Sequence, residues 1–438
     1  MKFWRTTVFS VAVMITVVPT AKAAPETFPA VNDLPVRKEM PDTMTMDDGT
    51  KVATLAQWRA RREEMKAILE HYELGHAPPP PGNVTGRDIK SAILLDGAVK
   101  YRLVHLKFGP EEKLGFDIAI FTPAKSAGPF PTIINPSFFN TPGVAVTNRL
   151  PTPSTAATNL QARLRLIFNS PVAPERAAAG FSNELGRGYA VVTYHYTECG
   201  ADDANFRTSS YYPAYPSYDW GVLLGWAWGL SRVVDYLETQ PFVDTNKVIA
   251  LGHSRLGKLV MVATAFDERI SLGAPAGSSG AGTGAYRFCG PGRGGKEGIE
   301  TMTRKFPYYF VPRLKEFTGQ MYKLPFEAYW YIALAAPRPW ISVEGMDDQN
   351  CVPNAVKQSV LAARPVYAFL GVSTNRVGVS YQPHRHMLTA GDVNAVLDFA
   401  DQQLRGIDHH RRFDQFPPDS ASATPEKISA TTNIMVEP

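Results

Sequence analysis

Cysteine is scarce in this chain, which has three cysteines, Cys199, Cys289 and Cys351, among 438 residues. An odd number allows at most one disulfide within the chain, and the sequence leaves the choice of the pair open. The spacing of the three residues matches no zinc-binding pattern. A zinc site built on cysteine is therefore not expected.

A charge imbalance is also absent. The formal net charge is +4, and no run of Lys or Arg concentrates it. A nucleic-acid partner is therefore not expected, because proteins that bind nucleic acids carry a basic patch or stripe. Apolar residues make up 44% of the chain, which is ample for a sizeable core in one large domain or two modest ones.

Long hydrophobic runs are missing too, so no ordinary membrane span is expected. The apolar run Val8–Val18 is too short, and it lies between two basic residues and the cleavage pattern Ala21-Lys22-Ala23. This arrangement predicts a signal peptide over residues 1–23, with an uncleaved anchor as the alternative. We expect the mature protein, residues 24–438, to be periplasmic or secreted and to be a monomer.

A sharp turn with a serine at its apex joins a predicted strand to a predicted helix. The turn Gly252-His253-Ser254-Arg255-Leu256 follows the apolar run Val248–Leu251 and precedes the helical stretch Lys258–Ala263. This is the arrangement of the nucleophile elbow of α/β-hydrolases, whose strict pattern is G-x-S-x-G. Leu256 departs from that pattern at the second glycine position, and Gly257 follows it. The alternative is a serine that caps a helix.

An elbow would direct the hydroxyl of Ser254 out of the sheet and into a cleft. The N–H of Arg255 would lie at a helix N-terminus, where it can face a developing oxyanion. The loop Pro136–Asn140 could lend a second oxyanion donor, and an ordinary loop is the equal alternative.

A nucleophilic serine needs a histidine base and an acid that orients it, and in α/β-hydrolases both follow the serine in the chain. His384 and His386 lie in a loop before the last predicted helix, and position alone does not separate them. The acid is expected after a late strand, where Asp347 and Asp348 follow Trp340–Val343. The alternative for these two residues is a solvated acidic loop.

The rest of the chain alternates between strand and helix patterns, which indicates a mostly parallel sheet covered by helices on both faces. We expect an α/β-hydrolase three-layer sandwich with antiparallel N-terminal strands. Residues 24–438 would form one catalytic domain with an N-terminal helix, Arg59–Tyr72, and loop insertions such as Leu150–Pro174. The further predicted strands are Tyr101–Phe108, Asp117–Phe121, Phe130–Asn135, Gly188–Tyr194, Ile270–Pro275 and Trp340–Glu344, with Val366–Leu370 leading into a last strand region; the further helices are Phe181–Arg187, Trp220–Thr239 and Val393–Leu404.

Motifs spread from the N-terminal helix to the last loop match one known family. The segments are Trp58–Pro78, Trp220-Gly221, Gly225–Gly229, Asp235–Glu238, Gly252–Lys258, Ser279–Gly282, Phe306-Pro307 with Phe310, Ile332–Leu334, Ala336–Pro339, and His386 with Thr389 and Asp392. The elbow and the Ala-Pro-Arg-Pro run are the most typical of them. Across nearly all of its mature length the chain thus resembles the glucuronoyl esterases, a carbohydrate esterase family.

The resemblance implies a role for each matching residue. Ser254 would be the nucleophile, His386 the base, and Arg255 an oxyanion stabiliser through its guanidinium and its N–H. Lys258 would hydrogen-bond sugar hydroxyls, although a solvated helix lysine is the alternative, and Glu297 matches a sugar-binding glutamate weakly.

Two departures from the family pattern bear on the acid and on the substrate. Many members carry the catalytic acid as a glutamate before the Ser-Gly of the loop after the elbow, where this chain has Ser278. Other members place it after the later strand, which favours Asp348 over Asp347. Asn350 stands where members often have a tryptophan that lines the sugar pocket.

The function that follows is hydrolysis of glucuronic acid esters, as in lignin–xylan linkages, through an acyl-enzyme. No metal or organic cofactor is required, and the partner would be a small-molecule or polysaccharide substrate. Two alternatives stay open: another serine esterase on this scaffold, such as an acetyl esterase, and a catalytically impaired carbohydrate-binding relative.

Overall fold

The computed structural model describes residues 28–144, 170–278, 280–290, 295–350 and 352–417. Its centre is a nine-stranded sheet in the order β1-β2-β3-β5-β4-β6-β7-β8-β9. The strands are β1 (Thr85–Leu94), β2 (Val99–Phe108), β3 (Leu114–Pro123), β4 (Phe130–Ser137), β5 (Ala190–His195), β6 (Val243–His253), β7 (Leu272–Ala276), β8 (Trp340–Gly345) and β9 (Val377–Gln382).

The mode of strand pairing changes once across the sheet, from antiparallel to parallel. β1 pairs antiparallel with β2, β2 with β3, and β3 with β5. From β5 through β4, β6, β7 and β8 to β9 every pairing is parallel. The predicted fold class, a mostly parallel α/β-hydrolase sheet with antiparallel N-terminal strands, is confirmed.

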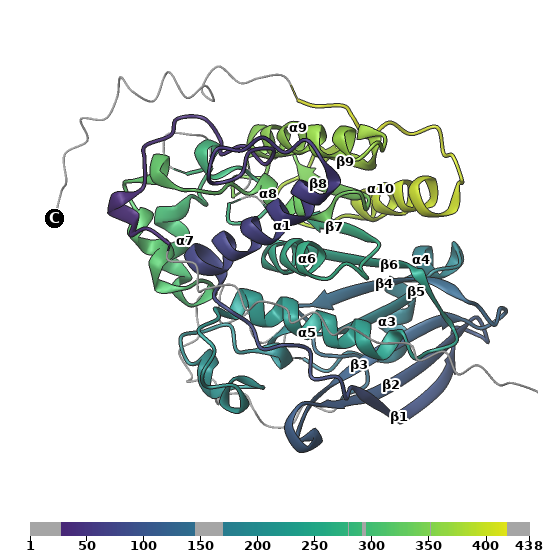
Figure 1. Cartoon of the computed structure of the whole chain (residues 1–438). Coiled ribbons are helices and arrows are strands. Elements are labelled where there is room, and N and C mark those ends of the chain that lie inside the picture. Colours follow the sequence, from purple (N-terminus) through teal and green to yellow (C-terminus); the bar gives the residue numbers. More distant parts are fainter. Residues whose placement is uncertain (1–27, 145–169, 279, 291–294, 351, 418–438) are drawn as a thin grey trace, which may run out of the picture.

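Helices cover both faces of this sheet (Figure 1). They are α1 (Leu55–Leu69), α3 (Pro174–Gly180), α4 (Ser182–Gly186), α5 (Val222–Leu237), α6 (Arg255–Phe266), α7 (Ile299–Lys305), α8 (Tyr329–Ala335), α9 (Pro353–Phe369) and α10 (Ala390–Ala400). One apolar core contains side chains of α1, α5, α6, α8 and α9, and two smaller cores on the other face contain α10 and the α3–α4 pair.

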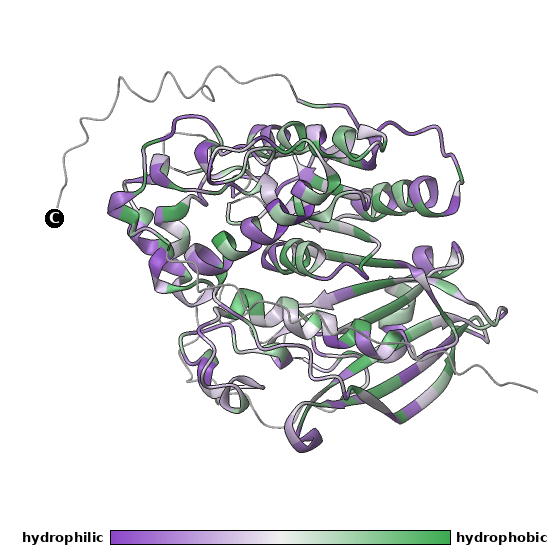
Figure 2. Ribbon diagram, in the orientation of Figure 1, coloured by the Kyte–Doolittle hydropathy of each residue, from purple (hydrophilic) through white to green (hydrophobic). Residues whose placement is uncertain are grey.

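The strand β6 shows how the sequence builds the three layers. Val248 and Ala250 point into the large core, whereas Ile249 and Leu251 point into the core beneath α10. Successive strand side chains face opposite sides of a sheet, so a strand buried on both faces must be apolar throughout. Figure 2 shows the apolar residues concentrated in the central strands and in the helix surfaces beside them.

The predicted N-terminal helix is present and begins four residues earlier than expected, at Leu55. Thr54 caps it, accepting the backbone N–H of Gln57 while the Gln57 side chain returns to the backbone of Thr54. This capping box supplies partners for two backbone N–H groups that a helix start leaves unpaired. Trp58 and Met65 of its apolar stripe are buried in the large core, so the helix packs on the main body as predicted.

Two segments have structure that the sequence did not predict. Val366–Leu370 precedes the last strand, β9, as expected, and Val366 to Phe369 also form the last turn of the helix α9, which contains Pro365. Strand β1 lies upstream of the first predicted strand, Tyr101–Phe108. It was not predicted because it is a solvent-exposed edge strand with little apolar alternation.

Some predictions fall outside the described residues. They include the signal peptide 1–23, most of the insertion Leu150–Pro174, and Cys351, so the division into residues 1–23 and 24–438 stays a prediction. Among the helices that the structure describes, none combines the length and the hydropathy that a membrane crossing requires.

Candidate active site

Ser254 sits at the apex of the turn between β6 and α6. Its backbone has φ 60° and ψ −125°, a conformation that non-glycine residues rarely adopt. The Ser254 N–H donates to the carbonyl of Ala276 on the neighbouring strand at 2.8 Å. Strained residues of this kind persist only where the surroundings hold them, and they cluster at functional sites.

Close backbone contacts explain the two glycines of the elbow. A Cβ at Gly252 would lie 2.4 Å from the carbonyl oxygen of Leu256, and a Cβ at Gly257 would lie 2.8 Å from Cβ of Ser278. Gly257 thus allows the close approach of the elbow helix to the loop after β7. Leu256 itself is buried with 2% of its surface exposed. The departure from G-x-S-x-G is therefore a shift of the second glycine by one position.

A hydrogen-bonded chain runs from Ser254 through His386 to Asp348. His386 Nε2 lies 2.8 Å from Ser254 Oγ, and His386 Nδ1 lies 2.6 Å from Asp348 Oδ2. A carboxylate accepts the proton on Nδ1, so Nε2 is left to accept the serine proton. Asp348 follows β8, and His386 lies between β9 and α10. The carboxyl ends of the parallel strands thus bring Ser254 and His386 together, although about 130 residues separate them in the chain.

The structure separates the alternatives that position left open. His384 Nε2 lies 2.9 Å from Asp392 at the start of α10, and its Nδ1 contacts the carbonyl of Arg385. Asp347 is exposed, whereas Asp348 is 5% exposed and contacts His386. His386 and Asp348 therefore have the positions that a base and its orienting acid require.

The surroundings of Asp348 hold its carboxylate in place. Asn350 donates its backbone N–H to Asp348 Oδ1 at 2.9 Å, which leaves Oδ2 for His386. Glu344, at the end of β8, is fully buried, and its burial together with the charge of Asp348 raises its pKa well above the usual value. A protonated Glu344 adds no second negative charge behind the His386–Asp348 pair.

His253, the residue before Ser254, lies against the ring of His386, with 4.6 Å between ring centroids. Burial, followed by the proximity of His386, lowers the pKa of His253 to about 4. Its ring is therefore neutral at ordinary pH and packs beside His386 without competing for a proton.

The side chain of Arg255, the residue after Ser254, pairs with Asp202. Its guanidinium carbon lies 5.9 Å from the centre of the Phe138 ring and 5.4 Å from that of Phe306. Burial opposes its charge, but Tyr309 and Asp202 outweigh that effect and raise the pKa of Arg255. The guanidinium is thus a fixed positive charge beside the elbow.

Asp202 was not found from the sequence. It also accepts hydrogen bonds from Tyr196 at 2.6 Å and Tyr308 at 3.1 Å. An aspartate in a loop 52 residues before Ser254 carries no local pattern, and only the fold brings it to Arg255.

Lys258 is buried, with 2% of its surface exposed, so the alternative of a solvated helix lysine is wrong. Its ammonium donates to the carbonyl of Ser278 at 2.7 Å and to Glu297 Oε2 at 2.8 Å. One helical turn separates it from Ser254, so both residues lie on the same face of α6. Lys258, Glu297 and the neighbouring half-buried Asn350 give this side of the site a polar wall.

The loop after β4 is folded on itself. The backbone N–H of Phe139 donates to Ser137 Oγ at 2.9 Å. This N–H is therefore used within the loop, and the Arg255 N–H at the start of α6 is the better placed backbone donor for an oxyanion. Within the described ranges, no group of three or more His, Cys, Asp or Glu side chains is arranged to hold a metal ion.

Comparison with known proteins finds carbohydrate esterases among the relatives of this chain. A family model described as "Glucuronyl esterase, fungi" matches residues 176–371. Carbohydrate esterase MZ0003, from an unknown prokaryotic organism, is 29% identical over 398 residues, covering 84% of this chain and 90% of that protein. A 4-O-methyl-glucuronoyl methylesterase of Phanerochaete carnosa is 27% identical, with coverage of 84% and 81%.

Solved structures agree with these relatives. A glucuronoyl esterase of carbohydrate esterase family 15 from Caldicellulosiruptor kristjansonii aligns with a TM-score of 0.70 at 29% identity. The alignment covers 90% of this chain and 98% of that one. The arrangement of sheet and helices is therefore similar to that of a solved structure.

Proposed function

Because this chain belongs to the glucuronoyl esterase family, we propose that it is a serine esterase that hydrolyses esters of glucuronic acid. The observation that carries the proposal is the unbroken hydrogen-bonded chain from Ser254 through His386 to Asp348. Such a chain converts an unreactive hydroxyl into a nucleophile at neutral pH.

The reaction begins when Ser254 Oγ attacks the ester carbonyl and His386 Nε2 takes its proton. The carbonyl oxygen becomes an oxyanion, which the Arg255 N–H and guanidinium stabilise by about 3–4 kcal/mol per donor. Collapse of the tetrahedral intermediate breaks the ester C–O bond, and His386 returns the proton to the departing alcohol. Water then attacks the acyl-enzyme by the same route and releases the acid. Asp348 keeps His386 in the required tautomer throughout.

The polar wall is suited to the acyl half of the ester. Lys258, one helical turn from the nucleophile, and its partner Glu297 offer a charged donor and a charged acceptor, as sugar hydroxyls require. Arg255 adds positive charge near a uronate carbonyl. Asn350, in place of a larger aromatic side chain, leaves room at the edge of this wall.

Location and assembly form a separate part of the proposal. The pattern at residues 1–23 supports export, and a periplasmic or secreted monomer would meet glucuronoxylan esters outside the cytoplasm. The resemblance to glucuronoyl esterases implies a substrate in lignin–xylan linkages, where glucuronate is esterified to an alcohol, and a similar protein is named a 4-O-methyl-glucuronoyl methylesterase.

The alternatives are separated by two assays. Hydrolysis of benzyl glucuronate should exceed that of 4-nitrophenyl acetate after each rate is corrected for its uncatalysed reaction, and Ser254→Ala should abolish both. An enzyme that prefers the acetyl ester would be another esterase on this scaffold. Failure of a fluorophosphonate to label Ser254 would instead indicate the impaired carbohydrate-binding relative.

A further inference from the structure

Arg255 and Asp202 form an ion pair beside the nucleophile elbow, in which Nη1 of the guanidinium donates to Asp202 Oδ2. The Asp202 side chain is 12% exposed and that of Arg255 is 31% exposed, so the carboxylate is shielded from water while the guanidinium stays partly open. A planar guanidinium that a fixed carboxylate holds at one nitrogen is restricted in orientation, and its other N–H groups point elsewhere.

Two tyrosines hold the carboxylate of Asp202 itself. Tyr196 donates to Oδ2 at 2.6 Å, and Tyr308 donates to Oδ1 at 3.1 Å and to the backbone carbonyl of Asp202 at 3.0 Å. The ring of Tyr196 packs against that of buried Trp226, with 5.0 Å between centroids. Both carboxylate oxygens thus have partners, and Asp202 is a rigid support for Arg255 rather than a mobile surface acid.

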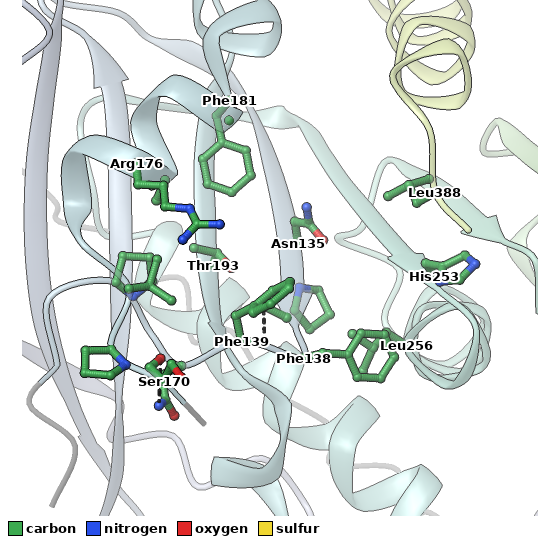
Figure 3. Close-up of a pocket in the computed structure, with 18 residues that line it drawn as sticks. Asn135, Phe138, Phe139, Ser170, Arg176, Phe181, Thr193, His253, Leu256 and Leu388 are labelled. Carbon is green, nitrogen blue, oxygen red and sulfur yellow. Dashed lines mark hydrogen bonds between the residues drawn. The ribbon is translucent and has the colours of Figure 1, made fainter. Parts of the chain in front are cut away.

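The guanidinium of Arg255 lies next to a space in which a substrate can bind. Its carbon is 5.9 Å from the ring centre of Phe138. Phe138 and Leu256, the residue after Arg255, line a cavity of about 610 Å³ (Figure 3), whereas Asp202 is not among the described residues that line it. Asp202 would thus act on a bound ester through Arg255 rather than by direct contact.

Hydrolysis of a uronate ester places two opposing demands on a positive charge at this position. The tetrahedral intermediate carries an oxyanion, which a guanidinium stabilises. The product is a free uronate, whose carboxyl group is ionised at neutral pH, so the same guanidinium would retain it. An arginine without a counter-charge would therefore bind the product tightly as well as the transition state, and tight product binding slows turnover.

We propose that Asp202 is a positioning residue that meets both demands. Its carboxylate orients the guanidinium of Arg255 toward the oxyanion, and its negative charge offsets that of the arginine, so the anionic product leaves readily. The inference rests on the proposed glucuronate esterase function and adds a residue to it.

Two consecutive aspartates provide a matched test. Asp203 is exposed and accepts the backbone N–H of Asn205 at 2.7 Å, a contact that an asparagine keeps. Asp202→Asn removes the charge at nearly constant size, and Asp202→Glu keeps the charge on a longer side chain. Asp203→Asn is the control for the loss of a negative charge in this loop.

The measurements are kcat/KM for benzyl glucuronate and the inhibition constant of free glucuronate, with circular dichroism to verify folding. Asp202→Asn should lower kcat/KM by about 10- to 100-fold, because the guanidinium loses its orientation. It should also strengthen inhibition by glucuronate about tenfold, because the charge of Arg255 is no longer offset. Asp202→Glu should be inhibited as weakly as the wild type while recovering only part of the turnover, and Asp203→Asn should match the wild type in both.

A double variant tests whether Asp202 acts through Arg255. Arg255→Ala alone should lower kcat/KM by about 10²- to 10³-fold, and the addition of Asp202→Asn should then change it less than twofold. An equal loss from Asp202→Asn with and without Arg255 would show that the aspartate acts by another route, contrary to the inference.

The direction of the change in product inhibition separates the proposal from a purely structural role. A distorted site would bind glucuronate more weakly, so lower turnover with weaker inhibition in Asp202→Asn would refute the inference, as would no change in either quantity. Strong inhibition in Asp202→Glu would contradict the charge balance. Each of these results leaves the esterase function standing, whereas absence of wild-type turnover on every glucuronate ester would overturn that function and the inference with it.

Discussion

Asp347 and Asp348 are consecutive carboxylates with opposite surroundings. Asp348 is buried and contacts His386, whereas the side chain of Asp347 is exposed. Loss of the buried carboxylate would leave His386 in the wrong tautomer, which in serine hydrolases costs about 10⁴-fold in kcat.

We therefore predict that Asp348→Asn lowers kcat on benzyl glucuronate by about 10³- to 10⁴-fold. Asp347→Asn, the matched control, should stay within twofold of the wild type. Steady-state kinetics at neutral pH, with circular dichroism to verify folding, make the comparison. An Asp348→Asn variant as active as Asp347→Asn would show that another residue is the catalytic acid.

Among the individual site residues, those that belong to a sequence motif could be predicted, whereas those that only the fold brings to the site could not. Ser254 is marked by its elbow, and the order of Ser, acid and His narrowed the search to two pairs of neighbours. Asp202 lies in a loop without a pattern, so its contact with Arg255 required the three-dimensional structure. The burial of Lys258 could not be predicted for the same reason, because its hydrogen-bond partners Ser278 and Glu297 lie in loops that are distant in the chain.

The elbow is a strained element held by close backbone contact. A methyl group at Gly252 would meet the Leu256 carbonyl at 2.4 Å, and backbone cannot move aside as a flexible side chain can. Gly186, on α4, has open space around it, so an alanine there costs nothing in packing.

Gly252→Ala should therefore lower the free energy of unfolding by about 2–3 kcal/mol and reduce kcat by at least tenfold, because Ser254 moves with the turn. Gly186→Ala should be neutral or slightly stabilising. Urea unfolding and ester hydrolysis test both variants. Unchanged stability and activity in Gly252→Ala would mean that the elbow is not tightly packed.

Buried Glu73 connects the end of the N-terminal helical segment to the main body. Tyr286 and Tyr331 donate hydrogen bonds to its two carboxyl oxygens at 2.5 and 2.6 Å. Burial raises the pKa of Glu73 from 4.5 to about 7, although both tyrosines act in the opposite direction. The folded protein therefore holds this proton more tightly than the unfolded chain does.

A raised carboxyl pKa stabilises the fold below the unfolded value and loses that effect as pH rises through the folded value. The stability of the wild type relative to Glu73→Gln should thus decline by about 3 kcal/mol between pH 4.5 and pH 7. Denaturant unfolding of both proteins from pH 4 to pH 8 measures it. A constant or rising difference would show that Glu73 is ionised when folded.

Helices and strands with a strong hydrophobic pattern could be predicted from the sequence, whereas those without one could not. Both the apolar stripe of α1 and the continuous apolar run of β6 follow from local sequence. The helix α9 was missed because Pro365 lies inside it and interrupts a pattern that tertiary packing nevertheless makes helical. The exposed edge strand β1 lacks an apolar face and depends on pairing with β2.

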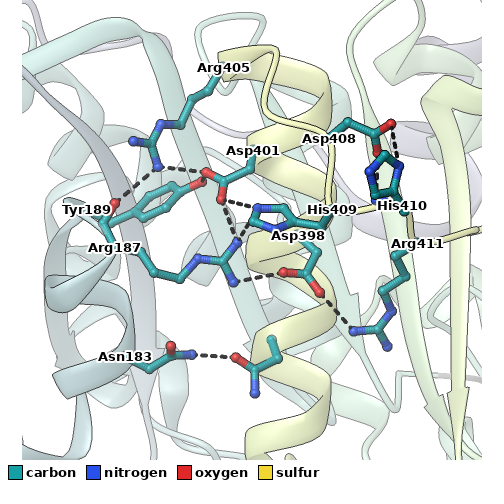
Figure 4. A network of polar contacts seen from close by, with 11 residues as sticks. Asn183, Arg187, Tyr189, Asp398, Asp401, Arg405, Asp408, His409, His410 and Arg411 are labelled. Carbon is teal, nitrogen blue, oxygen red and sulfur yellow. Dashed lines mark hydrogen bonds and ion pairs between the residues drawn. The ribbon is translucent and has the colours of Figure 1, made fainter.

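At the scale of the whole molecule, Asp401 joins segments far apart in the chain (Figure 4). It accepts hydrogen bonds from Tyr189 at 2.6 Å and pairs with Arg187 at 2.5 Å and Arg405 at 2.6 Å. Its carboxylate thereby fastens the C-terminal end of the last helix to the start of β5. Removing the charge would leave two arginines without their buried partner.

We predict that Asp401→Asn lowers the free energy of unfolding by about 2–3 kcal/mol without changing KM, because the network is remote from the elbow. Asp408→Asn, which breaks only the exposed pair with His410, should stay within about 0.5 kcal/mol. Thermal unfolding reports the difference. Equal melting temperatures for Asp401→Asn and Asp408→Asn would show that the Asp401 network does not stabilise the fold.

The central claim, covalent catalysis by Ser254, is tested most directly by trapping the acyl-enzyme. Wild type and Ser254→Ala are mixed with excess benzyl glucuronate, quenched in acid within milliseconds to seconds, and digested for peptide mass spectrometry. The account predicts a glucuronoyl group on the wild-type peptide that contains Ser254 and none in Ser254→Ala, which should also lose about 10⁶-fold in kcat. Turnover that persists in Ser254→Ala, or an acyl group attached to another residue, would contradict it.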